Sequence, residues 1–439
     1  MIRDKVVLAY SGGLDTTVAV RWLDHREGLD VIALLVDVGQ GGDLEMLRRR
    51  ALKSGAKEAL VVDAREEFAD EYLARALNAN SLYQGKYPLV SALSRPLICH
   101  HLARVAKQRQ AKFVAHGCTG KGNDQVRFEV SLAALAPDLE VLAPVRHWGM
   151  TRDQTMEYAA EHRLPTPTGT RSPYSIDENL WGRAIECGVL EDPFTEPPDD
   201  VWERTARRGS VTASSYLEVE FRRGIPVALD GKPMTFAEVI QQVELAAGSY
   251  GFGRVDMIED RVVGIKSREV YEAPAALALI AAHSDLEELT LDRNVLRTKR
   301  QLEKTYAELV YEGYWHSPLR EALDAFIAAT AAYVNGAVKL KLEPGSCRVV
   351  GRRSDASLYD TALATYDRED EFDHRASQGF VKLWGLPLKT WARAHQGRTA
   401  TEDEPKGHGG TDEQGEAQPG RGPDERPDGE LPSPESLTS

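Results

Sequence analysis

The string SGGLDTT, from Ser11 to Thr17, directly follows the first apolar run of the chain. Its paired glycines allow the backbone to turn tightly and to approach a ligand closely. The next residues favour a helix, whose first N–H groups would point back at the loop. Hydroxyls of Ser11, Thr16 and Thr17 add donors. The segment is predicted to cradle phosphate groups, and a plain strand–turn–helix joint is the alternative.

This cradle differs from the two common nucleotide-binding loops. The chain contains no G-x-x-x-x-G-K-[ST] string, and SGGLDTT is not a G-x-G-x-x-G fingerprint. A loop that holds pyrophosphate without the P-loop lysine suits an enzyme that cleaves ATP between its α and β phosphates. Asp15 is the one acid in the loop. It either compensates the helix N-terminus or helps to hold Mg²⁺ on the pyrophosphate.

A second loop, HGCTGKGNDQVRFE from His116 to Glu129, is rich in glycine and in side chains of both charges. Cationic and amide groups bind carboxylates, and an anion binds an ammonium group, so this mixture fits a zwitterionic amino acid. An ordinary polar loop that opens a helix is the alternative. The side chains that offer these groups are Thr119, Lys121, Asn123, Asp124 and Arg127.

Both loops must be positioned by the elements before them. Short runs of Val, Ile, Leu and Ala alternate with helical patterns over the first 150 residues, which predicts an α/β fold with a doubly wound parallel sheet. Ligands of such sheets bind beyond the carboxyl ends of the strands, where both loops fall. The expected strands are Lys5–Ala9, Val31–Val36, Ala59–Val62, Lys112–Ala115 and Val141–Val145, and the expected helices are Thr16–Asp24, Leu44–Ser54, Glu66–Asn78 and Ser94–Gln110.

The pattern changes to α+β after a connection rich in Pro, Thr and Ser, Pro165–Pro198. We expect an ATP-binding domain over residues 1–165, an α+β domain over 166–375, a C-terminal oligomerisation segment over 376–395 and a tail over 396–439. Expected strands in the second half are Tyr216–Phe221, Ile225–Leu229, Arg254–Ile258, Arg261–Ile265, Val338–Leu342 and Cys347–Val350, and expected helices are Phe236–Ala247, Pro274–His283, Arg293–Tyr311 and Pro318–Val334.

Composition excludes several classes of protein. The 439 residues carry 54 Lys and Arg against 68 Asp and Glu, a net charge of −14 that makes a poor generic nucleic-acid binder. Four scattered cysteines form no disulfide framework, and no apolar run is long enough for a membrane span, so a cytoplasmic setting is expected. Half of the net charge lies in residues 396–439, where 8 Gly and 6 Pro predict disorder.

The two loops carry a family resemblance. AYSGGLDTT (Ala9–Thr17) resembles the signature of the N-type ATP pyrophosphatases, and together with GCTGKGNDQVRF it resembles the two signatures of argininosuccinate synthase. Collinear matches cover roughly residues 3 to 390 and include VDVGQGG, SRPLI, RSPYSIDENLWGR, EDPF and GRVDMIEDRVVGIKSREVYE.

The resemblance implies a ligase that joins citrulline to aspartate through a citrullyl-adenylate, giving argininosuccinate, AMP and pyrophosphate. It implies ATP with Mg²⁺, a homotetramer and a place in arginine biosynthesis. Asp15, Asp124 and Arg127 would be catalytic. ATP would contact Ala9, Tyr10, Ser11, Gly12, Gly13, Leu14, Asp15, Thr16, Thr17 and Gly117; aspartate would contact Thr119, Asn123 and Asp124; citrulline would contact Tyr87, Asn123, Arg127, Ser175, Glu259 and Tyr271.

Some assignments stay open at this stage. Tyr87 and Tyr271 could be core tyrosines, and Glu259 falls at an apparent turn, where solvated acids are usual. Arg95 and Lys121 are further candidates for phosphate or carboxylate contacts. Family members often place hydroxyl residues at Ala92 and near Gly182, so fewer donors would hold citrulline here. No general base for the aspartate amine is evident, and a phosphate oxygen of the substrate could take that role.

Other functions remain as alternatives. GMP synthetase would need an amidotransferase domain with a Cys-His-Glu set, which the sequence does not show. A tRNA-thiolating enzyme would need paired reactive cysteines and a basic surface. A non-catalytic nucleotide-binding module would have no need for the second loop. The Cys99-His100-His101 string predicts no metal site, because neighbours on a helix point in different directions.

Overall fold

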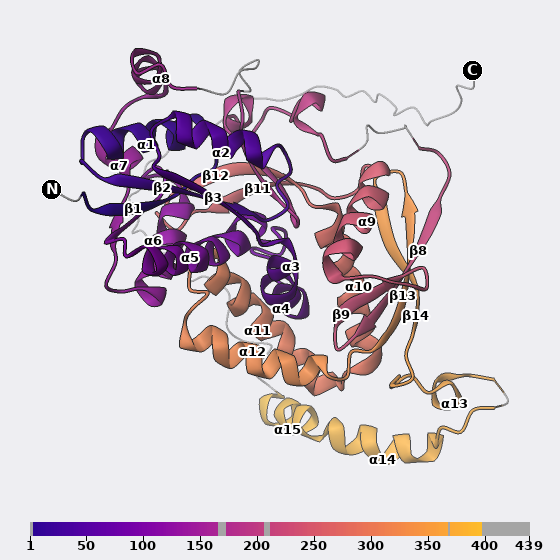
Figure 1. Ribbon diagram of the computed structural model, residues 1–439. Coiled ribbons are helices and arrows are strands. Elements are labelled where there is room, and N and C mark those ends of the chain that lie inside the picture. The colour runs from indigo at the N-terminus through magenta and orange to yellow at the C-terminus, as the bar shows by residue number, and fades with distance from the viewer. Residues whose placement is uncertain (1–2, 166–172, 206–210, 368, 397–439) are drawn as a thin grey trace, which may run out of the picture. The chain divides into compact units, whose positions relative to one another are not determined.

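The computed structural model describes residues 3–165, 173–205, 211–367 and 369–396. Its first half is built on five parallel strands in the order β3-β2-β1-β4-β5, as the alternating pattern predicted (Figure 1). The strands are β1 (Lys5–Ala9), β2 (Asp30–Asp37), β3 (Glu58–Asp63), β4 (Phe113–Ala115) and β5 (Glu140–Leu142).

Helices cover both faces of this sheet because alternate strand residues point to opposite sides. Val6 and Leu8 pack in one apolar cluster with Val20, on the face covered by α1 (Leu14–His25) and α2 (Leu44–Lys53). Val7 packs in another cluster with Leu97, on the face covered by α5 (Val90–Arg109) and α6 (Asn123–Leu135). Figure 1 shows the two helix layers with the strands between them.

Two expected elements of this half differ from the structure, and one helix was not expected. The expected strand Val141–Val145 ends at Leu142, because Pro144 opens the short helix α7 (Pro144–Trp148). The expected helix Glu66–Asn78 comprises α3 (Arg65–Glu67), a π-helical stretch η1 (Phe68–Leu73) and α4 (Ala74–Asn78). Helix α8 (Arg152–Glu161) was not expected, and a capping box on Thr151 starts it.

Two antiparallel sheets form the second half, in the orders β10-β9-β8-β13-β14 and β11-β12-β7-β6. Helices α9 (Phe236–Ser249) and α10 (Pro274–Thr290) pack together, and α11 (Arg293–Tyr311) is followed by α12 (Pro318–Ala331). The strands are β6 (Ser175–Asn179), β7 (Gly182–Glu186), β8 (Ser215–Arg222), β9 (Ile225–Leu229), β10 (Lys232–Pro233), β11 (Arg254–Asp260), β12 (Lys266–Glu272), β13 (Gly336–Glu343) and β14 (Ser346–Arg353); η2 (Gly188–Glu191) and η3 (Asp199–Val201) are short 3₁₀ turns.

Two predictions for this half were wrong. Arg261–Ile265 is not a strand but the turn between β11 and β12, closed by a bond from the Arg261 N–H to the Ile265 carbonyl. Gly264 has φ +87°, a conformation that glycine adopts without strain. The described part of the connection Pro165–Pro198 contains the β6–β7 hairpin, whose polar sequence hides its strands.

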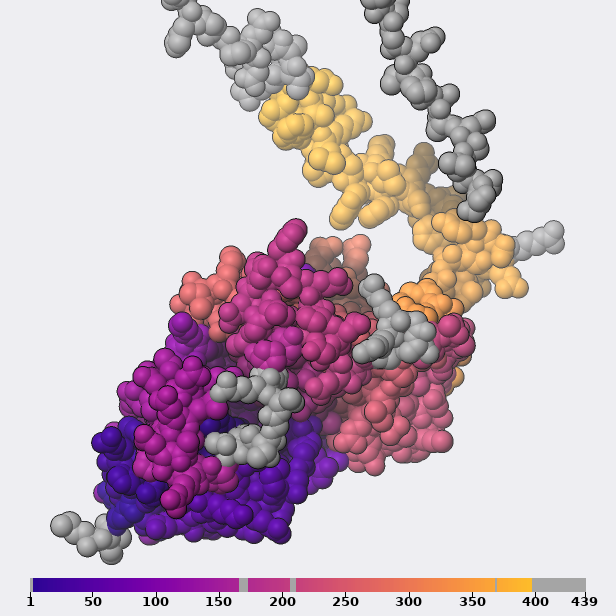
Figure 2. Space-filling view, turned by 90° about the horizontal axis from the view of Figure 1, so that it is seen from above, coloured from indigo at the N-terminus to yellow at the C-terminus, as the bar shows by residue number. Residues whose placement is uncertain are grey.

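The chain from Ala362 onward forms a separate unit from the one that ends at Thr361. It contains α14 (His374–Trp384) and α15 (Leu386–His395), which lie near the yellow end of the colour scale in Figure 2, after the short α13 (Thr361–Ala364). The segment 376–395, which was expected to mediate oligomerisation, is thus helical, with a break at Gly385. Of the predicted disordered tail, residues 397–439 lie outside the described residues, and the predicted domain boundaries at 165 and 375 remain predictions. Among the described helices, none is both long enough and apolar enough to span a bilayer.

Candidate active site

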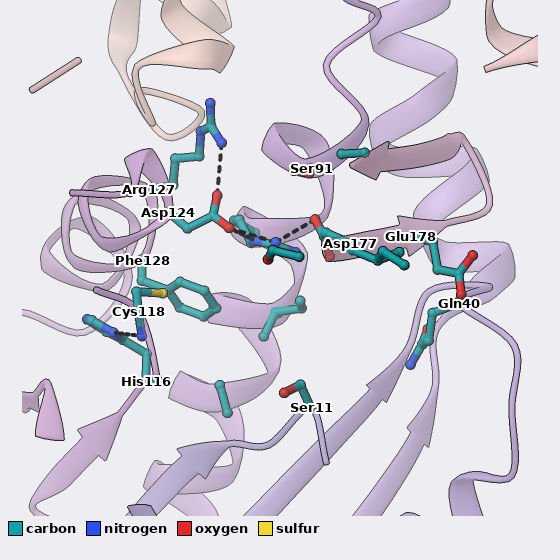
Figure 3. Close-up of a pocket in the computed structure, with 18 of the residues that line it drawn as sticks. Ser11, Gln40, Ser91, His116, Cys118, Asp124, Arg127, Phe128, Asp177 and Glu178 are labelled. Atoms are coloured by element: carbon teal, nitrogen blue, oxygen red, sulfur yellow. Dashed lines mark hydrogen bonds and ion pairs between the residues drawn. The ribbon is translucent and has the colours of Figure 1, made fainter. Parts of the chain in front are cut away.

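A cavity of about 570 Å³ opens where the carboxyl ends of β1 and β4 meet the second antiparallel sheet. Residues after β1 form one side of the cavity, and residues after β4 and at the start of α6 form the next. Strands β6, β7, β11 and β12 supply the facing wall. Figure 3 shows Ser11 beside the strand ends and Asp124 and Asp177 across the cavity from it. Both glycine-rich loops therefore border one space.

The first loop leaves helix N–H groups free for a ligand. Helix α1 starts after Gly13, and no described side chain caps it. Gly12 has φ +77°, a conformation that favours glycine, and a Cβ there would lie 2.5 Å from the Leu47 Cδ2. The Ser11 and Thr16 hydroxyl oxygens lie 3.1 Å apart at the cavity edge. The arrangement is a set of donors around the positive end of a helix, which is suited to an anion.

The predicted nucleotide residues do not all reach the cavity. Those that line it are Ala9, Tyr10, Ser11, Asp15, Thr16 and Gly117, whereas Gly12, Gly13, Leu14 and Thr17 do not. Thr17 is fully buried, and its hydroxyl lies 3.1 Å from that of Tyr10. The structure thus places Thr17 behind the cavity wall, where it supports Tyr10.

Asp124, at the start of α6, is held between two arginines. Its Oδ2 accepts hydrogen bonds from the Arg95 Nη2 at 2.7 Å and Nε at 3.0 Å, and its Oδ1 accepts one from the Arg127 Nη1 at 2.8 Å. Burial opposes ionisation, but the two guanidinium groups outweigh it and hold the pKa of Asp124 below its usual range. Arg95 also donates to the Asp177 Oδ2 at 2.6 Å. Asp124 is therefore a fixed carboxylate (Figure 3).

Arg127 has one nitrogen without a partner. Its Nε donates to the Tyr311 carbonyl oxygen at 2.8 Å, and its guanidinium lies 4.9 Å from the centre of the Tyr311 ring. The Nη2 atom is buried and has no hydrogen-bond partner among the described residues. Buried donors are normally satisfied, and Arg127 lines the cavity, so this atom is available to an acceptor on a ligand.

Asn123 connects the second loop by hydrogen bonds to Tyr311 and to the β11–β12 turn of the facing wall, called the far wall below. Its Nδ2 donates to the Tyr311 hydroxyl at 2.8 Å, and its Oδ1 accepts from the Val262 N–H at 2.9 Å. The Arg261 guanidinium reaches the Lys121 carbonyl oxygen at 3.4 Å. The predicted contact residue Lys121 itself is exposed and does not line the cavity.

Tyr87, Glu259 and Tyr271, which the sequence left open, come together in that wall. The rings of Tyr87 and Tyr271 stack with 4.3 Å between their centres. Glu259 is 1% exposed on β11, so the solvated-turn interpretation is wrong. Its carboxylate accepts from the Tyr271 hydroxyl and from the Tyr311 hydroxyl, the latter at 2.7 Å, while burial raises its pKa. Ser175 also lines the cavity.

This chain is apolar or sterically closed at the two positions where family members often place hydroxyl residues. Ala92 is buried and does not line the cavity. Gly182 has φ +153°, and a Cβ there would lie 2.7 Å from the Glu272 carbonyl oxygen. The residues of β7 that line the cavity are Ala184 and Glu186 instead. This strand therefore brings no hydroxyl group to the cavity at that point.

Several cavity residues were not predicted from the sequence. Gln40 follows β2, and its position after a strand was the signal that could have identified it. The others lie on polar hairpin strands or turns, where acids and arginines look like ordinary surface residues: Asp177, Glu178, Glu186, Arg261 and Glu269.

Comparisons with known proteins cover almost the whole chain. A family described as "Arginosuccinate synthase N-terminal HUP domain" matches residues 5–165, and "Arginosuccinate synthase C-terminal domain" matches residues 174–391. A relative from Dehalococcoides mccartyi, named argininosuccinate synthase, is 53% identical over 392 residues, covering 89% of this chain and 96% of its own. Another with the same name, from Oceanobacillus iheyensis, is 52% identical over 405 residues, with 92% and 97% covered.

Proposed function

The chain belongs to the argininosuccinate synthase family, and from that premise we propose that it condenses L-citrulline with L-aspartate through citrullyl-AMP. ATP is consumed, and argininosuccinate, AMP and pyrophosphate are the products, as a step of arginine biosynthesis. The observation that carries the proposal is the meeting of an anion cradle and the Asp124–Arg127 pair in one cavity. Adenylation and amine attack can then follow each other without release of the intermediate.

Activation of citrulline is the first step of this proposal. The ureido oxygen is a poor leaving group, and its attack on the α-phosphorus makes it part of a good one. Ser11, Thr16 and the free N–H groups of α1 hold the departing pyrophosphate. The oxygen donor set of Ser11, Asp15 and Thr16 fits Mg²⁺ bound with the nucleotide, and the ion would neutralise phosphate charge there.

Recognition of the two amino acids uses the second loop and the far wall. The partnerless Arg127 Nη2 meets the citrulline carboxylate, and Glu259 accepts from its N–H groups. Asp124 receives the aspartate ammonium, with Thr119 and Asn123 beside it. Binding both substrates in fixed positions supplies much of the rate enhancement. A phosphate oxygen of the adenylate takes the amine proton.

The test of the proposed function is substrate dependence. Purified protein is expected to release pyrophosphate from ATP only when citrulline is present, and to form argininosuccinate once aspartate is added. Citrulline labelled with ¹⁸O in its ureido group should transfer the label to the phosphate of AMP, because that oxygen attacks the α-phosphorus. Equal pyrophosphate release with other amides, or unlabelled AMP, would contradict the proposal.

Replacing Gly117 by Ala is expected to raise KM for ATP about tenfold, equivalent to about 1.4 kcal/mol. The new Cβ would lie 2.7 Å from the Thr16 Cγ2 and push that residue into the phosphate cradle. The matched control is Gly120→Ala in the same loop, where the nearest atoms lie 3.9 Å away. Steady-state kinetics with varied ATP check the result, and equal effects of the two substitutions would contradict the steric explanation.

The proposal extends to assembly and location. We propose a homotetramer in the cytoplasm, in which the C-terminal helices contact a neighbouring subunit. Support comes from the large apolar side chains that α14 and α15 expose: Phe380, Val381, Leu383, Trp384, Leu386, Leu388 and Trp391.

A further inference from the structure

Next to Glu259, the cavity wall carries a second acid, Glu269 on β12. Its side chain is 16% exposed. Its Oε2 lies 2.8 Å from the Tyr271 hydroxyl oxygen, and its Oε1 accepts from the Arg261 Nη2 at 2.9 Å. Tyr271 therefore stands between two carboxyl groups, those of Glu259 and Glu269.

The hydrogen bonds around Tyr271 determine which of the two acids is charged. The Tyr311 hydroxyl accepts a hydrogen bond from the Asn123 amide and donates one to the Glu259 carboxylate. Glu259 also accepts from Tyr271, so two donors stabilise it as a carboxylate. Tyr271 has only one hydroxyl proton, and that proton is already in the hydrogen bond to Glu259. The Tyr271 hydroxyl oxygen and the Glu269 Oε2 lie at hydrogen-bond distance, so the proton of this second hydrogen bond is assigned to the Glu269 carboxyl group.

The surrounding charges agree with this assignment. Burial raises the pKa of Glu269 to about 8, and the negative charges of Glu259 and Glu186 act in the same direction. Tyr271 and Arg261 oppose the increase but do not cancel it. The charged and titratable groups that face Glu269 come from β7, β11, the β11–β12 turn, β12 and the segment before α5: Glu186, Glu259, Arg261, Tyr271 and Tyr87.

We propose that Glu269 supports citrulline binding as a neutral acid: its carboxyl O–H donates a hydrogen bond to the Tyr271 hydroxyl oxygen, which leaves the Tyr271 O–H to donate its own hydrogen bond to the Glu259 carboxylate. When Glu269 ionises, its carboxylate and that of Glu259 compete for the single hydrogen bond that the Tyr271 hydroxyl can donate. The predicted citrulline contacts, Glu259 and Tyr271, then lose their fixed geometry. Glu269 is a positioning residue, because it acts through Tyr271. This inference rests on the proposed function, which places citrulline against this wall.

The test compares pH profiles of kcat/KM for citrulline. In the unmodified protein the value is expected to fall about 20-fold between pH 7.5 and pH 9.5, as one proton leaves Glu269. In Glu269→Gln the fall should shrink below about threefold, because the amide still donates to Tyr271 but cannot ionise. A fall of the same size and midpoint in both proteins, or a rise with pH, would overturn the proposal.

Glu186→Gln is the matched control, since Glu186 also pairs with Arg261. Removing its negative charge eases ionisation of Glu269, so the fall should persist with its midpoint at lower pH. A carbon NMR titration of labelled glutamate in the substrate-free protein tests the protonation separately: one carboxyl resonance should titrate near pH 8 and be missing in Glu269→Gln. Such a resonance in a protein that does not use citrulline would overturn the proposed function, whereas citrulline use without it would overturn the role of Glu269.

Discussion

Replacing Asp124 by Asn is expected to lower kcat/KM for aspartate about 1,000-fold, while KM for ATP changes less than about threefold. Asp124 is an ionised group between Arg95 and Arg127, and in the proposed function it also receives the aspartate ammonium. Asparagine keeps the shape but leaves the buried Arg127 guanidinium without its ion pair and Arg95 with Asp177 alone, which costs several kcal/mol. Steady-state kinetics with aspartate and ATP varied in turn would measure both effects.

Asp177→Asn serves as the control for this substitution. Asp177 accepts a hydrogen bond from the same Arg95 Nη2 and lines the same cavity, but it is half-buried, and no hydrogen bond or ion pair joins it to Arg127 in the described structure. A decrease of less than about tenfold in kcat/KM for aspartate is expected there. If Asp124→Asn instead removed ATP binding and left aspartate dependence intact, the role assigned to Asp124 would be wrong.

The parallel sheet could be predicted because its strands are buried on both faces. Such strands read as continuous apolar runs, and β1 was placed to the residue. The β6–β7 hairpin carried no such signal, because its sequence is mostly polar and β7 is buried by tertiary packing alone. Arg261–Ile265 contains three β-branched residues, Val262, Val263 and Ile265, but turns at Gly264. The local pattern failed for β7 because this strand is short and partly polar, and its burial comes from distant parts of the chain.

The site residues could be predicted where polar and charged side chains directly follow a strand. Both glycine-rich loops do so, and they supply the residues that face each other across the cavity. The far wall was only partly accessible from sequence. Tyr311 ends an amphipathic helix, and nothing local shows that its hydroxyl donates to Glu259, 52 residues earlier. Glu269 looks like a surface acid on a polar strand until the fold places it beside Tyr271.

Replacing Arg127 by Lys is expected to lower kcat/KM for citrulline about 1,000-fold. Arg127 makes separate bonds to the Tyr311 carbonyl and to Asp124 and keeps Nη2 for a ligand. A lysine ammonium carries all its donors on one nitrogen and lacks the planar guanidinium group. It therefore cannot reach three acceptors that lie in different directions. Kinetics with varied citrulline, together with rescue of the activity of Arg127→Ala by added guanidinium, would measure the contribution of the Arg127 guanidinium group.

Arg320→Lys separates this effect from a general loss of stability. Arg320 is buried like Arg127, pairs with Asp324 four residues on and stacks over Trp315 at 4.5 Å, but it does not line the site cavity. Both substitutions should therefore lower the melting temperature by a few degrees. Only Arg127→Lys should change kcat/KM for citrulline. If the two variants lost activity in parallel with their melting temperatures, packing rather than ligand contact would explain Arg127, and the free Nη2 atom would have no role in binding citrulline.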